Sequence, residues 1–328
     1  MMKILFCLLL AWVPSNANQY QNPIAPSSPD PWMQYYNGFY YLIATSWGSS
    51  VGIRKASTLD GLKSVDNTSV YSFDGHSLWA PEIHLVDGKW YLFYSACASD
   101  TDPANWGCHR NHVAESASDD PMGPYTFKAD LIDPNDENME LDPSYIFING
   151  EQYLMGSYNI NGLANLFIRP MANPYTPTGA KRMLSTPTYD WEKEGETINE
   201  GPEPLYHDGR IFVVYSASSC SGANYKLGLL EFVGTDPLDS THWQKYPTPL
   251  FQRSEENHVY GPGHNGFFKS PDGTEDWLVY HANDVNTEGC TMARSSRAQK
   301  FTWSDDGIPV FGIPEATGVT YESPSGEN

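Results

Sequence analysis

The sequence is poor in basic residues and, beyond its first residues, in long apolar runs. Its 328 residues include 19 Lys and Arg against 40 Asp and Glu, which gives a formal net charge of −21. Nucleic acids and anionic membrane surfaces are bound mainly through Lys and Arg, so this balance argues against both partners. No stretch after residue 13 is long and apolar enough to span a bilayer. The sequence thus predicts a protein that binds neither nucleic acid nor membrane.

The only marked apolar run lies at the N-terminus. Lys3 is followed by the apolar residues 4–13, which are too few to cross a membrane, and Ser15-Asn16-Ala17 offers small residues for cleavage. We therefore expect residues 1–17 to be a signal peptide and the mature protein to be secreted and extracellular; the alternative is a buried N-terminal helix. Export would also make Asn67, in Asn-Thr-Ser, an acceptor for N-glycosylation.

Cysteines are few, and their number is even once the signal peptide is removed. Cys7 lies within that segment, which leaves Cys97, Cys108, Cys220 and Cys290. An even count in an exported chain favours two disulfides, and the wide spacings match no zinc pattern. Three pairings are possible. Because Cys97 and Cys108 flank a short polar loop, we expect Cys97–Cys108 and Cys220–Cys290.

Helical patterning is also absent. No long segment has apolar residues at a 3.6-residue period, whereas 27 Gly and 25 Pro supply many turns. Apolar residues make up 40% of the chain and aromatic residues 14%, which is enough for a large core. This composition predicts a turn-rich, all-β protein.

One strand pattern recurs five times. After a turn, each copy runs into aromatic and β-branched residues, as in Gly88-Lys-Trp-Tyr-Leu-Phe-Tyr-Ser; the copies begin at Gly38, Gly88, Gly150, Gly209 and Thr274. Such strands suit a sheet that is buried on both faces. Five sheets in a ring bury one another's faces, so we expect residues 18–328 to form a single catalytic domain, a five-bladed β-propeller. A β-sandwich is the alternative.

A polar residue precedes each repeated strand at a similar offset. These residues are Asp30, Glu82, Asp142, Glu200 and His264, six to nine positions before the turn. In a propeller the innermost strands line a central channel, so four acids and a histidine would meet there. Clustered carboxylates resist ionising together, which keeps one as an acid and another as a base, as hydrolysis of a glycosidic bond requires. Singly, each is also compatible with a turn or a solvated strand end.

The ordered motifs resemble glycoside hydrolase family 43 over nearly the whole mature chain. They are Asp30-Pro, Trp79-Ala-Pro-Glu, Leu141-Asp-Pro-Ser, Glu200-Gly-Pro and Gly261-Pro-Gly-His-Asn. The resemblance implies a five-bladed propeller with an inverting, three-acid site that needs no cofactor for its chemistry. Within it, Asp30 corresponds to the general base and Glu200 to the general acid. Asp142 corresponds to a residue that raises the pKa of the acid and orients it.

The same resemblance assigns further residues. His264 corresponds to a channel histidine that contacts a hydrated Ca²⁺ or another cation, and Arg294 to an arginine in the first sugar subsite, with Arg297 left open. Either Glu200 or Glu203 could serve as the acid by chemistry. The family pattern selects Glu200, and strand parity directs Glu203 away from the channel if the strand is regular.

Aromatic residues near these motifs are candidate sugar platforms, because the C–H faces of sugars pack on aromatic rings. They are Trp79, Trp32 and Trp106, and Glu82 beside Trp79 is a further candidate substrate contact. Core packing is the alternative for each tryptophan.

The predicted activity is release of terminal α-L-arabinofuranose from plant cell-wall arabinan or arabinoxylan by a monomeric enzyme. A β-xylosidase or an endo-α-1,5-arabinanase of the same family is the near alternative. A non-catalytic carbohydrate-binding propeller is the alternative from another class, and the complete Asp30, Asp142 and Glu200 set argues against it.

Overall fold

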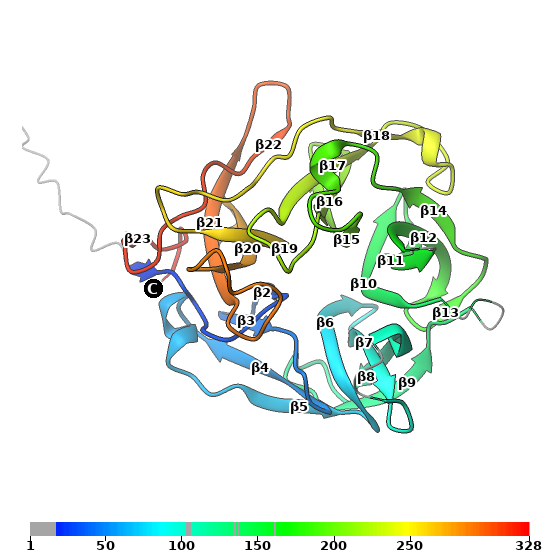
Figure 1. Cartoon of the computed structure of the whole chain (residues 1–328). Helices are drawn as coiled ribbons and strands as arrows, with labels where there is room; N and C mark the ends of the chain where they lie inside the picture. The colour runs from blue at the N-terminus through cyan, green and yellow to red at the C-terminus, as the bar shows by residue number, and fades with distance from the viewer. Residues whose placement is uncertain (1–17, 103–105, 134–135, 137, 161, 328) are drawn as a thin grey trace, which may run out of the picture.

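Five antiparallel sheets are arranged around a common centre (Figure 1). The computed structural model describes residues 18–327 except 103–105, 134–135, 137 and 161. The innermost strands β2, β6, β10, β15 and β19 contact one another in a closed cycle. The predicted five-bladed propeller is confirmed, whereas the predicted signal peptide, residues 1–17, lies outside the described residues.

Each sheet is a meander from the centre outward. The first four sheets comprise β2 (Trp32–Tyr36), β3 (Phe39–Ile43), β4 (Ser50–Ala56) and β5 (Thr68–Ser72); β6 (Gly75–Val86), β7 (Lys89–Ala98), β8 (Arg110–Ser116) and β9 (Tyr125–Asp130); β10 (Glu140–Ile148), β11 (Glu151–Ile160), β12 (Leu163–Asn173), β13 (Thr176–Pro177) and β14 (Arg182–Ser185); and β15 (Asn199–His207), β16 (Arg210–Ala217), β17 (Lys226–Phe232) and β18 (Trp243–Lys245). The fifth sheet comprises β19 (Tyr260–Lys269), β20 (Asp276–Asn283), β21 (Ser295–Trp303) and β22 (Pro309–Val310). Short 3₁₀ turns occupy η1 (Asp60–Lys63), η2 (Trp106–Cys108), η3 (Asp190–Glu192) and η4 (Ser240–His242).

The repeated sequence pattern begins at tight hairpin turns. Four sheets join their first two strands through an Asn-Gly or Asp-Gly pair in which both residues have positive φ, for example Asn37 at 47° and Gly38 at 85°. This geometry matches the twist of an antiparallel pair and is tolerated best by Asn, Asp and Gly. The turn residues therefore fix where each second strand begins.

The apolar core is divided among the five interfaces between neighbouring sheets. One buried cluster lies at each interface: around Trp90 between the first and second sheets, Phe93 between the second and third, Tyr215 between the third and fourth, Tyr280 between the fourth and fifth, and Tyr40 between the fifth and first. Every sheet thus buries both faces, which explains why its strands lack polar alternation.

The ring is closed without a covalent link. Strand β1 (Gln19–Gln21) pairs with β23 (Thr320–Glu322), and Ala25 forms a bridge to Ser296 of β21. The Tyr20 hydroxyl donates to Ala298 O at 2.9 Å. The two ends of the described chain are therefore held together beside the fifth sheet.

Both predicted disulfides are present, Cys97–Cys108 and Cys220–Cys290. Within the described residues, no helix combines the length and apolarity that crossing a membrane would require. Asn67 is exposed just before β5, and its glycosylation stays a prediction.

Candidate active site

Each innermost strand begins near a residue with left-handed backbone conformation. These residues are Asp30, Ala80, Asp142, Gly201 and His264, with φ between 44° and 57°. They lie eight positions before the turn glycine in the first four sheets and nine in the fifth, so they are equivalent positions in the ring. The register of the inner strand shifts close to this residue in the last four sheets. The sequence prediction of a common phase therefore needs correction, because Glu200 lies one residue before the shared position and Glu82 two residues after it.

The amide at this position is held by a neighbouring side chain in every sheet. In four sheets the acceptor is a side chain at the end of the repeated second strand of the preceding sheet. The pairs are Ala80 N with Thr45 Oγ1 (2.8 Å), Asp142 N with Ser95 Oγ (3.0 Å), His264 N with Ser216 Oγ (2.7 Å) and Asp30 N with His281 Nδ1 (3.1 Å). In the fourth sheet, Gly201 N donates to Asp142 Oδ2 at 2.9 Å. These bonds satisfy amides that the irregular register would leave unpaired, and they fix each sheet relative to the next.

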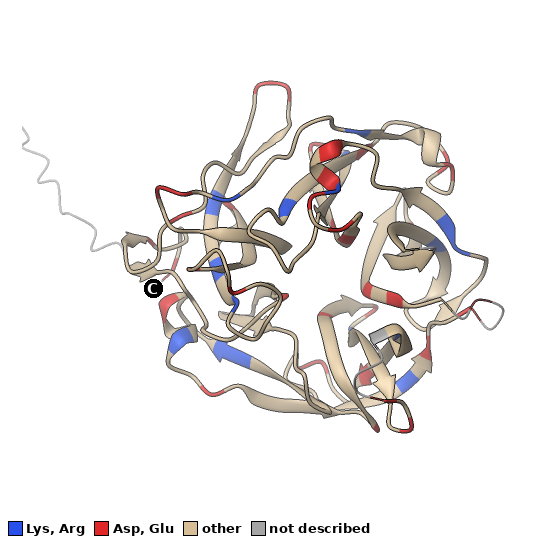
Figure 2. Cartoon of the chain, viewed as in Figure 1, with Lys and Arg blue, Asp and Glu red and all other residues tan. Residues whose placement is uncertain are grey.

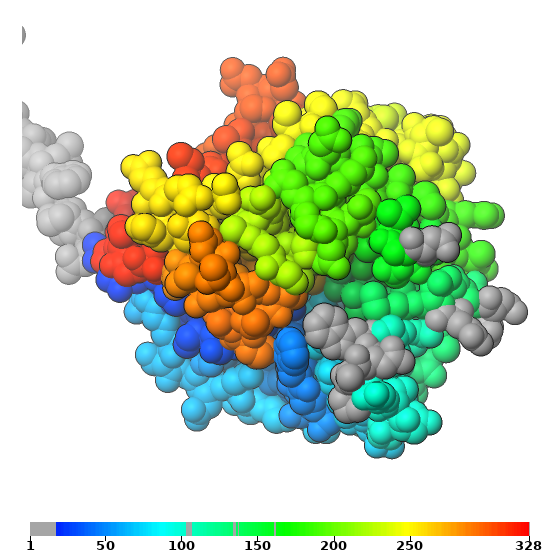
Figure 3. All heavy atoms as spheres, in the orientation of Figure 1, coloured from blue at the N-terminus to red at the C-terminus, as the bar shows by residue number. Residues whose placement is uncertain are grey.

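A cavity of about 220 Å³ lies where these positions meet. Asp30, Asp142 and Glu200 all line it, so the three predicted acids share one hollow. Residues from the third and fourth sheets form most of its lining, and the first, second and fifth sheets supply the rest. Figure 3 shows blue, green and orange segments side by side on the viewed face of the ring. Its volume is below the roughly 300–1,000 Å³ of pockets for drug-sized ligands, which suits a single sugar unit.

Asp30 is surrounded by donors and positive charge. The Thr45 hydroxyl donates to Oδ2 and the Arg294 guanidinium to Oδ1, both at 2.7 Å. His264 Nδ1 lies 3.5 Å from Oδ1. Burial acts to raise the pKa of Asp30, but the charge of Arg294, followed by His264 and His281, lowers it well below its usual range. Asp30 is therefore held as a carboxylate.

Glu200 has the opposite environment. Burial, followed by the charge of Asp142, raises the pKa of Glu200 to about 8 despite a hydrogen bond from the Tyr225 hydroxyl to Oε1 at 2.7 Å. Asp142 accepts at Oδ2 from Gly201 N and from the Ser157 hydroxyl at 3.2 Å. Its own pKa is also raised, chiefly by burial. One cavity thus holds a carboxylate and a carboxylic acid at neutral pH.

The structure brings three of the six other predicted site residues to this cavity. Trp79, Arg294 and His264 line it. Arg297 does not, because its side chain is fully buried elsewhere and donates to Asp284 Oδ1 at 2.9 Å. Of the two arginines left open by the sequence, Arg294 is therefore the one at the site.

Trp32 and Glu82 do not line this cavity, contrary to the prediction. Trp32 is 6% exposed and packs in the core between the first two sheets. Glu82 is buried, and its Oε2 lies 2.7 Å from His84 Nε2. Its carboxyl interacts with that of Glu203, and burial raises the pKa of both carboxyls well above the usual range.

Glu203 does not point away from the axis, because the strand lacks the regularity on which that expectation depended. Between Glu200 and Glu203, β15 contains one residue more than its partner β16, because Glu200 pairs with Ser216 and Glu203 with Val214. In a regular strand, residues three positions apart point to opposite sides. The extra residue offsets this alternation, so both glutamates face inward at different depths. Glu203 accepts from the Ser144 hydroxyl of β10 at 3.2 Å and lines a separate hollow with Trp32 and His84.

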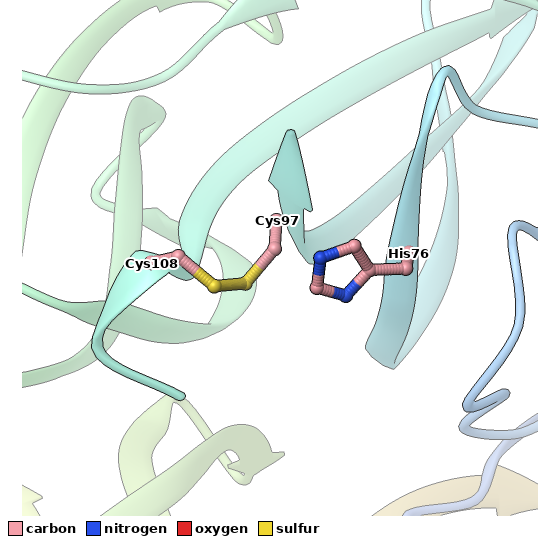
Figure 4. Close-up of side chains that lie close together, drawn as sticks. All are labelled: His76, Cys97 and Cys108. Atoms are coloured by element: carbon pink, nitrogen blue, oxygen red, sulfur yellow. A yellow bond between two sulfur atoms is a disulfide. The ribbon is translucent and has the colours of Figure 1, made fainter. Parts of the chain in front are cut away.

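The predicted cation beside His264 has no ready-made side-chain ligand set. Among the described residues, one group of three His, Cys, Asp or Glu side chains brings its ligand atoms within 4.8 Å of one another: His76, Cys97 and Cys108 (Figure 4). Its two sulfurs are bonded to each other and are not thiolate ligands. This group does not include His264. Trp106 begins η2, and its side chain lies outside what the structure describes.

Sequence reasoning missed several residues of the site. Trp47 lines the cavity from an irregular segment after β3 and is 44% exposed, while Tyr225 reaches Glu200 from just before β17. Neither belongs to a repeat. Thr45, Ser157 and His281 end the repeated strand pattern, and that periodicity was a signal that could have identified them.

Comparisons with known proteins identify similar sequences and structures. The sequence model of glycosyl hydrolases family 43 matches residues 20–309. An extracellular exo-α-(1→5)-L-arabinofuranosidase of Streptomyces avermitilis is 38% identical over 92% of this chain, and α-L-arabinofuranosidase 43 of Humicola insolens is 34% identical over 93%. The chain spans 65% and 66% of these two relatives, just under two thirds. The crystal structure of an α-L-arabinofuranosidase from Lactobacillus brevis has a TM-score of 0.84 and 33% identity, covering 92% of this chain and 98% of that one.

Proposed function

The chain belongs to glycosyl hydrolase family 43, and we propose that it is an inverting, exo-acting α-L-arabinofuranosidase that releases terminal arabinofuranose from arabinan or arabinoxylan. The observation that carries the proposal is that one cavity places Asp30 against the Arg294 guanidinium and holds Glu200 as a buried carboxyl next to Asp142. Arg294 holds Asp30 as a carboxylate, while burial and Asp142 hold Glu200 protonated at neutral pH. A binding module would need neither state.

In the proposed mechanism Asp30 acts as the general base and Glu200 as the general acid. Asp30 removes a proton from a water molecule as that water attacks the anomeric carbon from one side of the sugar. Glu200 gives its proton to the glycosidic oxygen on the other side as the bond to the leaving sugar breaks. Inverting enzymes keep such groups about 6.5–9.5 Å apart, which leaves room for the water. Asp142 positions the acid through Gly201 N and favours its protonated form.

Two further features support action on chain ends. The cavity has room for a single sugar unit, and the tryptophans Trp47 and Trp79 provide ring faces at its wall. Hydrolysis of linear and branched arabinan, arabinoxylan and xylo-oligosaccharides tests the proposal. Free arabinose as the sole early product, appearing first as the β-anomer by NMR, supports it. A ladder of oligomers indicates endo action, xylose indicates a β-xylosidase, and binding without turnover indicates a binding module.

The pH profile provides a test of the proposed acid. The active form of Glu200 is protonated, so it is present below a pKa of about 8 and is lost as pH rises through that value. We expect kcat/KM, which reports the free enzyme, to fall above about pH 8. In Asp142→Asn the charge that contributes to the raised pKa is gone, so this alkaline limb should move to lower pH. An unmoved limb in that variant would contradict the role of Asp142.

A second prediction concerns the support of Trp79. The ring of Trp79 stacks on His109 with centroids 3.9 Å apart, and His109 Nδ1 lies 3.3 Å from Cys97 Sγ in the Cys97–Cys108 disulfide. Stacked rings contribute about 0.5–1.5 kcal/mol, so His109→Ala should raise KM about two- to tenfold with little change in kcat. The control is His112→Ala, which removes a buried histidine of the same sheet outside the cavity. An unchanged KM in His109→Ala would remove Trp79 from the proposed subsite.

We also propose that the protein acts outside the cell, as a monomer. The Streptomyces relatives are named extracellular, and two disulfides suit an oxidising compartment. A water-held cation beside His264 is part of the proposal, but no step of the mechanism depends on it.

A further inference from the structure

A second hollow adjoins the catalytic cavity. Its volume is about 450 Å³, and its walls are Glu194, Gly195, Glu196, Ser219, Ser221, Gly222 and Asn224. Glu196 and Ser221 also line the catalytic cavity, so the two spaces share a wall. We call the second space the side groove. A chain whose terminal unit occupied the cavity could continue into this groove.

The side groove is built by the sheet that carries the proposed acid. Its walls come from the segment between η3 and β15 and from the segment between β16 and β17, and Glu200 lies on β15. In Figure 2 part of the ribbon in the first of these segments has the colour of acidic residues. In an inverting reaction the acid contacts the oxygen that joins the terminal sugar to the rest of the chain. The leaving part of the substrate must therefore lie on the side where Glu200 and the groove are found.

Internal bonds hold the groove in shape. The Ser219 hydroxyl donates to Glu196, and Lys226 Nζ lies 3.0 Å from Glu194 Oε1. The disulfide between Cys220 and Cys290 ties the second wall to the fifth sheet. A site that is already ordered loses less entropy when a flexible glycan binds. Gly195 and Gly222, which also line the groove, carry no side chain that would narrow it.

We propose that the side groove binds the leaving-group part of the substrate, a neutral chain rich in hydroxyl groups, and selects against acidic glycans. Carboxylates accept hydrogen bonds from sugar hydroxyls, and charge-assisted bonds of this kind are among the stronger ones. Lys226 balances the charge of Glu194, but a uronic acid would bring a further negative charge beside Glu196 and would be repelled. This inference rests on the proposed function and adds to it the chemistry of the accepted chain.

The experiment compares substrates that reach the groove with one that does not. For wild type, Glu196→Lys and Asn224→Ala, kcat/KM is measured on an α-1,5-arabino-oligosaccharide and on an aryl α-L-arabinofuranoside. Hydrogen bonds to charged groups contribute about 1.5–3 kcal/mol, so Glu196→Lys should lose at least about tenfold on the oligosaccharide. Because Glu196 also lines the catalytic cavity, some loss on the aryl glycoside is expected, but that loss should be several times smaller than the loss on the oligosaccharide. The variant should also gain relative activity on oligosaccharides that carry uronic acid. The control is Glu151→Gln, an exposed glutamate at the turn between β10 and β11.

Two outcomes overturn the inference: equal effects on both substrates, or no effect on either. Failure of the proposed function is a separate result, in which wild type releases no arabinose from any substrate. In that case calorimetry of arabino-oligosaccharide binding to wild type and to Glu196→Lys decides the inference without turnover. Equal affinities would refute it, and an affinity lost only in the variant would support it.

Discussion

Replacing Glu200 by glutamine is expected to lower kcat on arabino-oligosaccharides by about 10²–10⁴-fold, the usual contribution of general acid catalysis. Glutamine has the shape of the protonated acid and can still accept from Tyr225, but it has no proton to give to the glycosidic oxygen. The loss should be much smaller on an aryl arabinofuranoside whose leaving group departs without protonation. Rates on both substrates, measured side by side, provide the test.

The matched control for this variant is Glu203→Gln. Glu203 lies three residues away in the same motif and is also a buried carboxyl with a raised pKa, but it lines the other hollow with Trp32 and His84. It should retain wild-type rates on both substrates. If Glu203→Gln takes the larger loss, or if Glu200→Gln loses equally on both substrates, the acid has been assigned to the wrong residue.

Replacing Asp30 by asparagine should give a loss of similar size that does not depend on the leaving group. The missing step is removal of a proton from the attacking water, and this step is required whatever group departs. Asparagine is preferred to alanine because its amide oxygen can still accept from the nearly buried Arg294, while its NH₂ group can donate to the Thr45 hydroxyl oxygen. Removing both acceptor oxygens would leave a buried cation unpaired, which costs about 3–5 kcal/mol of stability.

Azide provides an independent readout for Asp30→Asn. A small anion that enters the space of the attacking water needs no base, so added azide should restore turnover and form a β-L-arabinofuranosyl azide from an activated aryl substrate. The control variant is Asp284→Asn, whose carboxylate bonds to Arg297 and does not line the cavity. Full activity of Asp30→Asn without azide would refute its role as the base.

Much of the fold could be predicted because its determinants are local and repeated. The Asn-Gly and Asp-Gly turns and the apolar second strands recur in the sequence, and a ring is the arrangement in which strands buried on both faces satisfy one another. Asp30 and Asp142 could be placed at the axis for the same reason. Both disulfides followed from the even number of cysteines and the short loop between Cys97 and Cys108.

The errors arose where the backbone departs from regular strand geometry. A regular strand would have directed Glu203 away from the axis, but β15 contains an extra residue relative to β16. This irregularity depends on how the two strands pair, and no residue type in Glu200-Gly-Pro-Glu203 indicates it. Glu82 was placed in the cavity from its motif, whereas its offset from the left-handed residue carries it toward His84. Trp47 and Tyr225 belong to non-repeating connections, so no periodic signal pointed to them.

At the five equivalent left-handed positions, the backbone conformation does not depend on which side chain is present. Asp30, Asp142 and His264 project their side chains from the same backbone conformation that Ala80 adopts with only a methyl group. An ionisable residue introduced at Ala80 would extend from the same backbone conformation as these three side chains, and the hydrogen bond from its amide to Thr45 Oγ1 would stay in place. The chemistry of the ring can therefore change through substitutions at these five backbone positions while the backbone itself stays the same.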